Sequence, residues 1–332
     1  MASESFTCFL VENVNGELVR GIQERTTGDL PEGDVLLEIE YSAVNYKDAL
    51  AASGHKGVAL SLPLVPGIDG VGTVIASRSD RCREGDKVMV SGADFGTRNW
   101  GGWATRAQVD GSYCIPLPNG LSEREAAIVG TAGFTAAQSV ERLQHHGVKP
   151  EQGPILVTGA TGGVGTFGVA LLAQLGFEVV AVTGKADQAE WLKSLGATEV
   201  ISREEACDES GRPLLSGKWA GAIDTVGGKI LDTTLRSTQP RGCVTACGLV
   251  AGHQLEMTVY PFILRGVSLQ GIDSANASVA YREQLWQRLA TDLKVDDLDR
   301  LGTDVSLVDV EQSVLDILAG KVRGRHVVVT KS

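Results

Sequence analysis

The chain of 332 residues has few of the residues that build metal centres or disulfide frameworks. It holds 6 cysteines and 5 histidines. No two cysteines have C-x-x-C spacing and none clusters with histidine, which argues against structural zinc and against a disulfide framework. Scattered cysteines are typical of reducing compartments, and the N-terminus lacks the basic and apolar segments of a secretion signal. We therefore expect a cytoplasmic protein without a metal.

Long hydrophobic runs and excess positive charge are also missing. No apolar run reaches the roughly 18 residues of a membrane span. Lys and Arg number 30 against 41 Asp and Glu, a net charge of -11, which disfavours nucleic acid and anionic membrane surfaces. The composition, 43% hydrophobic and 21% charged, is that of a globular protein. At roughly 100 to 200 residues per domain, the length predicts two domains.

The first third of the chain is predicted to be rich in β-structure. Residues 34–45 alternate apolar and polar side chains, and 70–77 and 87–92 are short apolar runs bounded by Gly and Asp. The pattern changes near residue 121. Ser122 and Glu125 have capping-box spacing and open a predicted helix, with a break expected at 130–133.

Strands and helices then alternate, which predicts a doubly wound parallel sheet. The C-terminal segment GRHVVVTKS is a predicted strand that returns to the first domain. The predicted strands of the sheet are 155–159, 178–184, 199–202, 220–227, 242–248 and 267–273.

A glycine-rich turn, VTGATGGVG, joins the first of these strands to a helix. Its glycines have G-x-x-G-x-x-G spacing instead of the usual G-x-G-x-x-G. A strand, a turn and a helix N-terminus in this order form an anion site. The N–H groups of Thr161 and Val164 can reach a pyrophosphate, and Gly162 and Gly163 permit close approach of the backbone. The turn predicts a dinucleotide site.

The end of the second strand selects the dinucleotide. NAD sites usually carry an Asp or Glu there, about 20 residues after the turn, for the ribose 2′-OH. This strand ends in Thr183, Gly184 and Lys185, without a carboxylate, and Arg203 follows the third strand. Because a 2′-phosphate favours cations, we predict NADPH as the cofactor.

Motifs along the whole chain resemble the medium-chain dehydrogenase/reductase superfamily. SAVNYKD and PGIDGVG stand where zinc-dependent members carry a Cys and a Gly-His-Glu motif, so the zinc ligands are missing. The chain resembles the zinc-free, quinone oxidoreductase-like branch. The resemblance implies a GroES-like β-barrel catalytic domain at 1–125 and 272–332, and a Rossmann domain at 126–271.

Within that branch, nine segments in order resemble the acrylyl-CoA reductases, among them NYKDALA, TGATGGVG, CGLVAG and GRHVVV. The resemblance implies NADPH-dependent reduction of the carbon–carbon double bond of acrylyl-CoA, in a cytoplasmic homodimer. A quinone or enone reductase of the same fold is the alternative. A non-enzymatic NADPH-binding protein that recognises RNA fits the acidic chain less well.

Reduction of an unsaturated thioester needs donors at the oxygen on which negative charge develops. The Asn45 amide and the Tyr46 hydroxyl are the candidates, and the resemblance also implies a cofactor contact for Tyr46. Arg98 is the candidate for a CoA phosphate, and Trp100 for covering the acyl group. Three further cofactor contacts are expected at Thr225, Leu249 and Arg325.

Overall fold

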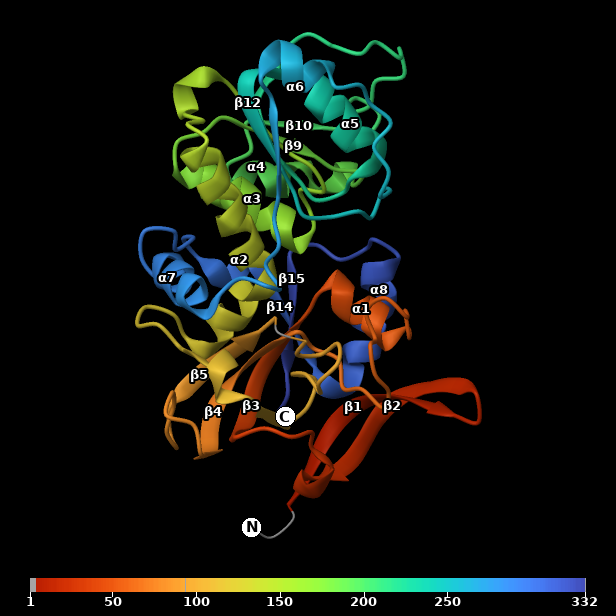
Figure 1. Ribbon diagram of the computed structural model, residues 1–332, viewed down its shortest axis with the longest axis vertical. Helices are drawn as coiled ribbons and strands as arrows, with labels where there is room; N and C mark the ends of the chain where they lie inside the picture. Colours follow the sequence, from red (N-terminus) through yellow and green to blue (C-terminus); the bar gives the residue numbers. More distant parts are fainter. Residues whose placement is uncertain (1–3, 93, 332) are drawn as a thin grey trace. The chain divides into compact units, whose positions relative to one another are not determined.

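The computed structural model describes residues 4–92 and 94–331, which form two compact units. Unit 1 consists of Met1–Thr131 and Ser274–Ser332, and unit 2 of Ala132–Asp273 (Figure 1). The chain therefore leaves unit 1 once, builds unit 2 from one continuous segment, and returns.

Unit 1 begins with an antiparallel hairpin that the sequence patterns did not predict. Strands β1 (Ser5–Val14) and β2 (Glu17–Thr26) pair along their full length. β1 turns Phe6, Phe9 and neighbouring apolar side chains into a buried cluster, whereas most of β2 is exposed or half-buried. Apolar burial on one strand holds the hairpin to the unit.

A mixed seven-stranded sheet forms the centre of unit 1. The C-terminal strand β15 lies inside it, antiparallel to β3 and parallel to β14. Along the sheet the order is β14-β15-β3-β4-β5-β7, and β6 pairs with β3. The strands are β3 (Val35–Val44), β4 (Asp69–Ser77), β5 (Lys87–Ser91), β6 (Arg106–Val109), β7 (Ile115–Pro116), β14 (Gly302–Ser306) and β15 (Arg325–Val329).

Four helices belong to or start in unit 1: α1 (Tyr46–Ala52), α2 (Glu123–His145), α7 (Val279–Leu289) and α8 (Val310–Leu318). The predicted capping box opens α2, because Ser122 N donates to Glu125 at 2.8 Å and Glu125 N donates to Ser122 Oγ at 3.1 Å. The predicted break lies at Gly130, where φ is 44° and ψ is -157°. α2 continues beyond this kink into unit 2.

Unit 2 contains a parallel sheet of six strands in the order β10-β9-β8-β11-β12-β13. This is the doubly wound sheet predicted from the alternation of strands and helices. α3 and α4 cover one face and α5 the other (Figure 1). The strands are β8 (Ile155–Val157), β9 (Val179–Val182), β10 (Glu199–Ile201), β11 (Trp219–Asp224), β12 (Thr238–Ala246) and β13 (Ser268–Gly271). The helices are α3 (Gly163–Gln174), α4 (Ala189–Ser194), α5 (Gly228–Arg236) and α6 (Tyr260–Arg265).

The core of unit 2 explains why these strands are runs of apolar residues. Leu156, Val180, Ala222 and Val244 come from four adjacent strands and are nearly or fully buried in one cluster. Parallel strands covered on both faces need such runs. In the part of the chain that the structure describes, no helix is long and apolar enough to cross a membrane.

Candidate active site

The glycine-rich turn joins β8 to α3 in unit 2, as predicted. Gly159 adopts φ of 60°, and a side chain there would place its Cβ 2.3 Å from Thr225 Oγ1. A Cβ on Gly165 would lie 2.3 Å from Gly159 O, so α3 starts against the turn only because this residue is glycine. The N–H groups of the first turn of α3, at Gly163 and Val164, have no partner within the helix ladder. This turn has the backbone of an anion cradle.

The end of β9 lies beside this turn. Thr161 Oγ1 and Thr183 Oγ1 are 3.3 Å apart, and both threonines are buried. Lys185 N donates to Thr183 Oγ1 at 3.1 Å, which fixes the direction in which the chain leaves the strand. The turn predicted to bind the pyrophosphate and the strand end predicted to bind the 2′-phosphate therefore lie side by side in unit 2.

Two cations meet beside Gly184. A Cβ on Gly184 would lie 2.7 Å from Arg203 Nε, so the guanidinium lies against the backbone of Gly184. Burial lowers the pKa of Lys185, and the charge of Arg203 lowers that pKa further, whereas Asp187 raises it. Two like charges held close together form a ready site for an anion such as a phosphate.

The end of β11 packs against the same turn. Thr225 N donates to Thr158 Oγ1 at 3.0 Å, and Thr225 Oγ1 donates to Thr158 O at 2.8 Å. Asp224 is buried and accepts from Thr158 Oγ1 and Gly227 N, both at 2.7 Å. Burial raises the pKa of Asp224. These bonds fix the backbone at Thr225, and Leu249, after β12, is 60% exposed.

In unit 1, Asn45 and Tyr46 lie at the start of α1. Asn45 is the N-cap, and its N–H and Nδ2 both donate to Asp48 Oδ2, at 2.8 and 2.9 Å. The other oxygen of Asp48 accepts from Gly67 N at 3.1 Å and Ile68 N at 2.7 Å. Tyr46, the first residue of the helix, is 39% exposed. The capped turn therefore presents the tyrosine at the surface of unit 1.

Asp69 and Arg325 complete a buried polar cluster around Asn45, and Thr131 hydrogen-bonds to it. The Nδ2 of Asn45 also donates to Asp69 Oδ2 at 2.8 Å, and its Oδ1 accepts from Arg325 Nη1 at 2.9 Å. Asp69 Oδ1 accepts from Thr131 N at 2.8 Å and Thr131 Oγ1 at 2.7 Å. Arg325 Nη2 lies 3.5 Å from Asp69 Oδ2. We call Asn45, Asp48, Asp69 and Arg325 the buried cluster.

The buried cluster bears on two expectations from the sequence. Both amide hydrogens of Asn45 are directed at carboxylates, so neither is left for a substrate oxygen. Arg325 is 2% exposed and bonded to Asn45 and to Ile128 O, so its guanidinium cannot reach a cofactor phosphate in this arrangement. The spacing Asn45-x-x-Asp48 is a capping-box signal that was present in the sequence. No sequence pattern indicated that Thr131 would contact this cluster.

The two residues expected to contact substrate lie in different settings. Arg98 is exposed, and its Nε is 3.1 Å from Asp94 Oδ2. Trp100 is 7% exposed, packs 6.5 Å from the ring of Phe6, and donates from Nε1 to Pro63 O at 3.0 Å. Trp100 is therefore a core side chain of unit 1 in this structure.

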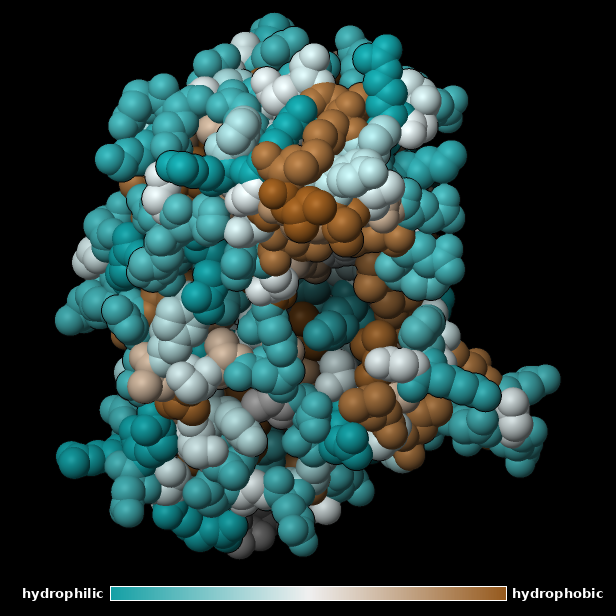
Figure 2. All heavy atoms as spheres, turned by 45° about the horizontal axis from the view of Figure 1, so that its top comes forward, coloured by the Kyte–Doolittle hydropathy of each residue, from teal (hydrophilic) through white to brown (hydrophobic). Residues whose placement is uncertain are grey.

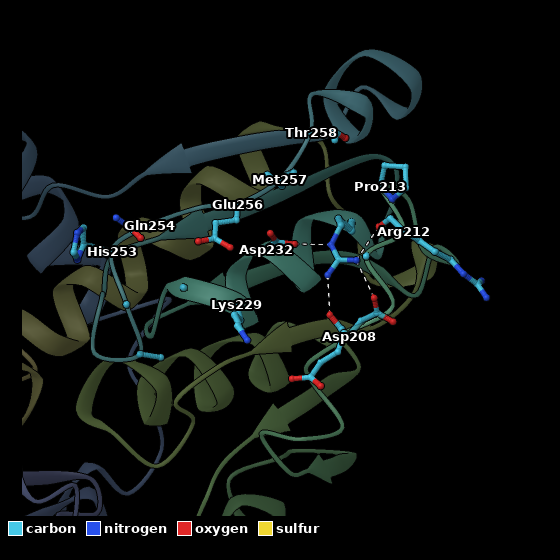
Figure 3. A pocket seen from close by; sticks show the side chains of 16 residues that line it. Asp208, Arg212, Pro213, Lys229, Asp232, His253, Gln254, Glu256, Met257 and Thr258 are labelled. Carbon is cyan, nitrogen blue, oxygen red and sulfur yellow. Dashed lines mark hydrogen bonds and ion pairs between the residues drawn. The ribbon is translucent and has the colours of Figure 1, made fainter.

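Unit 2 also holds a cavity of about 640 Å³ between α5 and the segments around 208–213 and 251–258 (Figure 3). Arg236 lies at its wall and pairs with Asp208 at 2.9 Å and Asp232 at 2.5 Å. Lys229 and Glu256 also line it. None of the residues predicted for the dinucleotide lines this cavity. Within residues 4–92 and 94–331, no group of three His, Cys, Asp or Glu side chains is placed to hold a metal ion.

Comparison with known proteins agrees with this geometry. A family model described as an alcohol dehydrogenase GroES-like domain matches residues 31–119. A second, described as a zinc-binding dehydrogenase, matches residues 163–291. The first lies within unit 1, and the second covers the glycine-rich turn from Gly163 onward.

Two curated relatives match nearly the whole chain. The acrylyl-CoA reductase AcuI of Ruegeria pomeroyi is 45% identical over 314 residues, which cover 95% of each chain. The putative quinone oxidoreductase YhfP of Bacillus subtilis is 45% identical over 304 residues, 91% of this chain and 92% of that protein.

Two solved structures extend the likeness to three dimensions. The yhdH oxidoreductase of Salmonella enterica, in complex with NADP, has a TM-score of 0.94 at 43% identity, covering 98% of this chain and 100% of that one. Bacillus subtilis yhfP, with NAD bound, has a TM-score of 0.95 at 43% identity, covering 99% and 100%. The chain therefore belongs to the medium-chain dehydrogenase/reductase superfamily, in its quinone oxidoreductase-like branch.

Proposed function

We propose that this protein is an NADPH-dependent acrylyl-CoA reductase, which reduces the carbon–carbon double bond of acrylyl-CoA to give propanoyl-CoA. The observation that carries the proposal is the pair of cations, Lys185 and Arg203, at the strand end where NAD sites usually carry a carboxylate. The Ruegeria relative named for this activity, 45% identical along 95% of both chains, supports the substrate.

The residues of unit 2 fit the cofactor. We assign the pyrophosphate to the backbone of Thr161, Gly162, Gly163 and Val164, because the start of α3 offers N–H groups and the positive end of its dipole. We assign the 2′-phosphate to the segment Thr183–Lys185 and to Arg203, where the two like charges are compensated when a dianion binds. The backbone at Thr225 and the exposed Leu249 complete the proposed contacts.

NADPH, when bound, supplies the hydride that reaches Cβ of the acrylyl group, and a proton then reaches Cα. Negative charge develops on the thioester oxygen during the first step and needs a donor. The buried cluster occupies Asn45, so the Tyr46 hydroxyl remains as the candidate donor. Arg98 remains the proposed contact for a CoA phosphate, since its exposed pair with Asp94 contributes little and can exchange.

We also propose a homodimer formed through unit 2. Apolar side chains gather over the α6 region (Figure 2), and Val259, Ile263 and Leu264 are each more than 60% exposed. β13 is the last strand of its sheet, so its outer edge offers unpaired backbone groups to a second copy. A cytoplasmic location is supported by all six cysteines being free.

A substrate panel tests the activity. Purified protein is mixed with NADPH or NADH and with acrylyl-CoA, crotonyl-CoA or a benzoquinone, and the absorbance of the reduced nicotinamide is followed. The proposal expects the highest kcat/KM for NADPH with acrylyl-CoA. Turnover of the quinone alone would instead establish a quinone reductase, the activity suggested by the name of the Bacillus relative.

A further inference from the structure

Three loops of unit 2 meet at one buried acid, Asp224, the last residue of β11. The carboxyl ends of parallel strands lie at the same edge of a sheet, and the loops that follow β8, β11 and β12 all start at that edge. These loops carry the residues to which we assign the pyrophosphate, after β8, and the assigned contacts Thr225, after β11, and Leu249, after β12.

Thr158 connects the first loop to the second. It comes directly before the glycine-rich turn, is fully buried, and donates from Oγ1 to Asp224 Oδ1 at 2.7 Å. The same hydroxyl accepts from Thr225 N at 3.0 Å, and Thr158 O accepts from Thr225 Oγ1 at 2.8 Å. Because the hydroxyl hydrogen is directed at the carboxylate, the oxygen lone pairs can accept the Thr225 N–H. A chain of hydrogen bonds therefore runs from the carboxylate to the backbone of the second loop.

The remaining polar atoms of Asp224 hold the second and third loops. Its Oδ2 accepts from Gly227 N at 2.7 Å and from Val226 N at 3.3 Å. Its main-chain oxygen accepts from Cys247 N at 3.0 Å and from Cys247 Sγ at 3.4 Å. One residue is thus hydrogen-bonded to all three loops.

The position of Asp224 requires an acceptor that carries no hydrogen of its own. Three donors point at its two carboxylate oxygens. An asparagine amide or a protonated acid would direct a hydrogen at one of these donors. Burial raises the pKa of Asp224, so the ionised form is held here at a cost in free energy. Such groups gather at functional sites, where the arrangement that they impose has a use.

We propose that Asp224 and Thr158 are positioning residues that hold the three loops in the cofactor-binding arrangement before the dinucleotide binds. The inference rests on the proposed function, which assigns the dinucleotide to these loops. Both side chains are fully buried, so they act through the backbone of the loops. Loops that are already ordered lose less conformational entropy on binding, and the affinity is higher as a result.

The test measures the dissociation constants of NADPH and NADH by fluorescence titration. Thr158→Val removes the hydroxyl and should raise both constants about 10-fold, because the buried Thr225 N–H loses its acceptor in the binding arrangement. Asp224→Asn leaves the Thr158 hydroxyl hydrogen without an acceptor and should raise both constants about 5-fold. Thr158→Ser keeps the hydroxyl, and both constants should stay within about twofold of the wild-type values.

Thr238→Val is the matched control. Thr238 is also a fully buried threonine, but it is the first residue of β12, at the opposite edge of the same sheet, and its hydroxyl donates to Thr234 O at 2.7 Å. This variant should leave both constants unchanged. The double variant Thr158→Val/Asp224→Asn should raise them by less than the product of the two single factors, because the residues share one hydrogen bond. Factors that multiply would contradict a shared action.

A merely structural role would change a different quantity. The variants would then lower the free energy of unfolding of the unliganded protein, while the folded protein bound both cofactors as tightly as wild type. Positioning instead raises the KM for NADPH with acrylyl-CoA and leaves kcat within about threefold, because saturating cofactor restores the arrangement. The ratio of the NADH constant to the NADPH constant should not change, since the pyrophosphate is common to both.

Hydrogen exchange on the wild-type protein needs no variant and decides the matter if a variant fails to fold. The amides of Thr225, Gly227 and Cys247 are held by this network. They should exchange slowly without cofactor, and NADPH should slow them little further. Fast exchange without cofactor, with strong protection once NADPH is added, would show that the loops become ordered only around the cofactor and would refute the inference.

The outcomes separate the two proposals. Wild-type protein that binds neither NADPH nor NADH would refute the proposed function, and this inference with it. Wild-type binding that Thr158→Val and Asp224→Asn leave unchanged, or that Thr238→Val weakens equally, would refute the inference alone. Weaker binding of both cofactors in the first two variants, with wild-type binding in Thr158→Ser, supports it.

Discussion

Replacing Lys185 with alanine removes one of the two cations beside Gly184. The change should weaken the binding of NADPH much more than the binding of NADH. Burial lowers the pKa of Lys185 and the charge of Arg203 lowers it further, so a bound dianion would stabilise this ammonium. A hydrogen bond to a charged partner contributes about 1.5–3 kcal/mol, which corresponds to about a 10- to 150-fold increase in the dissociation constant of NADPH. NADH lacks the 2′-phosphate, and its dissociation constant should change less than twofold.

Fluorescence titration of both cofactors checks this prediction. The matched control is Lys193→Ala, which removes a lysine of α4 that pairs with Glu190 at the surface of the same unit. It should leave both constants unchanged. Equal weakening of NADPH and NADH by Lys185→Ala would refute the assignment of the 2′-phosphate to this strand end. A weak salt dependence of NADPH binding would also argue against it, because exposed ionic contacts are screened by salt.

Three predictions concern stability, each read from chemical denaturation. Gly130→Ala should cost about 2–5 kcal/mol, because φ is 44° and a Cβ would lie 2.6 Å from Asp69 Oδ2; a change below 1 kcal/mol would contradict this. Trp103→Ala should lower the free energy of unfolding by about 3–5 kcal/mol, since the indole is fully buried and donates to Ala43 O. A change near zero would contradict this and would indicate that neighbouring side chains fill the cavity. The pKa of Asp48, raised to about 6, should make its contribution to the free energy of unfolding fall as pH rises from 4 to 6, by about 2 kcal/mol. Asp48→Asn should remove that slope, and an unchanged pH profile would refute the assignment.

Local sequence patterns predicted much of the fold of unit 2. Strands buried on both faces are continuous apolar runs, and the turn between β8 and α3 needs glycine at Gly159 and Gly165 for reasons of backbone geometry. The capping box at Ser122 is equally local. Such features involve residues close together in the sequence, so they can be recognised without knowledge of the fold.

The buried cluster could not be predicted in this way. Asn45 meets Arg325 from 280 positions away and Asp69 from 24 positions away. The pairing of β15 with β3 creates this meeting, and no local pattern specifies it. From the sequence, Asn45 is a candidate donor to the substrate and Arg325 a candidate cofactor contact, whereas tertiary packing buries both. The hairpin of β1 and β2 was missed for a different reason: β2 is mostly exposed and lacks a clear apolar alternation.

The position of β15 within the sheet has a consequence for how the chain is made on the ribosome. Unit 2 ends at Asp273 and is one continuous segment, so it can fold while the chain is still being extended. The sheet of unit 1 cannot close until Arg325–Val329 has emerged and inserted between β14 and β3. Until then the edge of β3 at Tyr41–Val44 lacks its partner strand, and loss of the last ten residues would leave unit 1 incomplete.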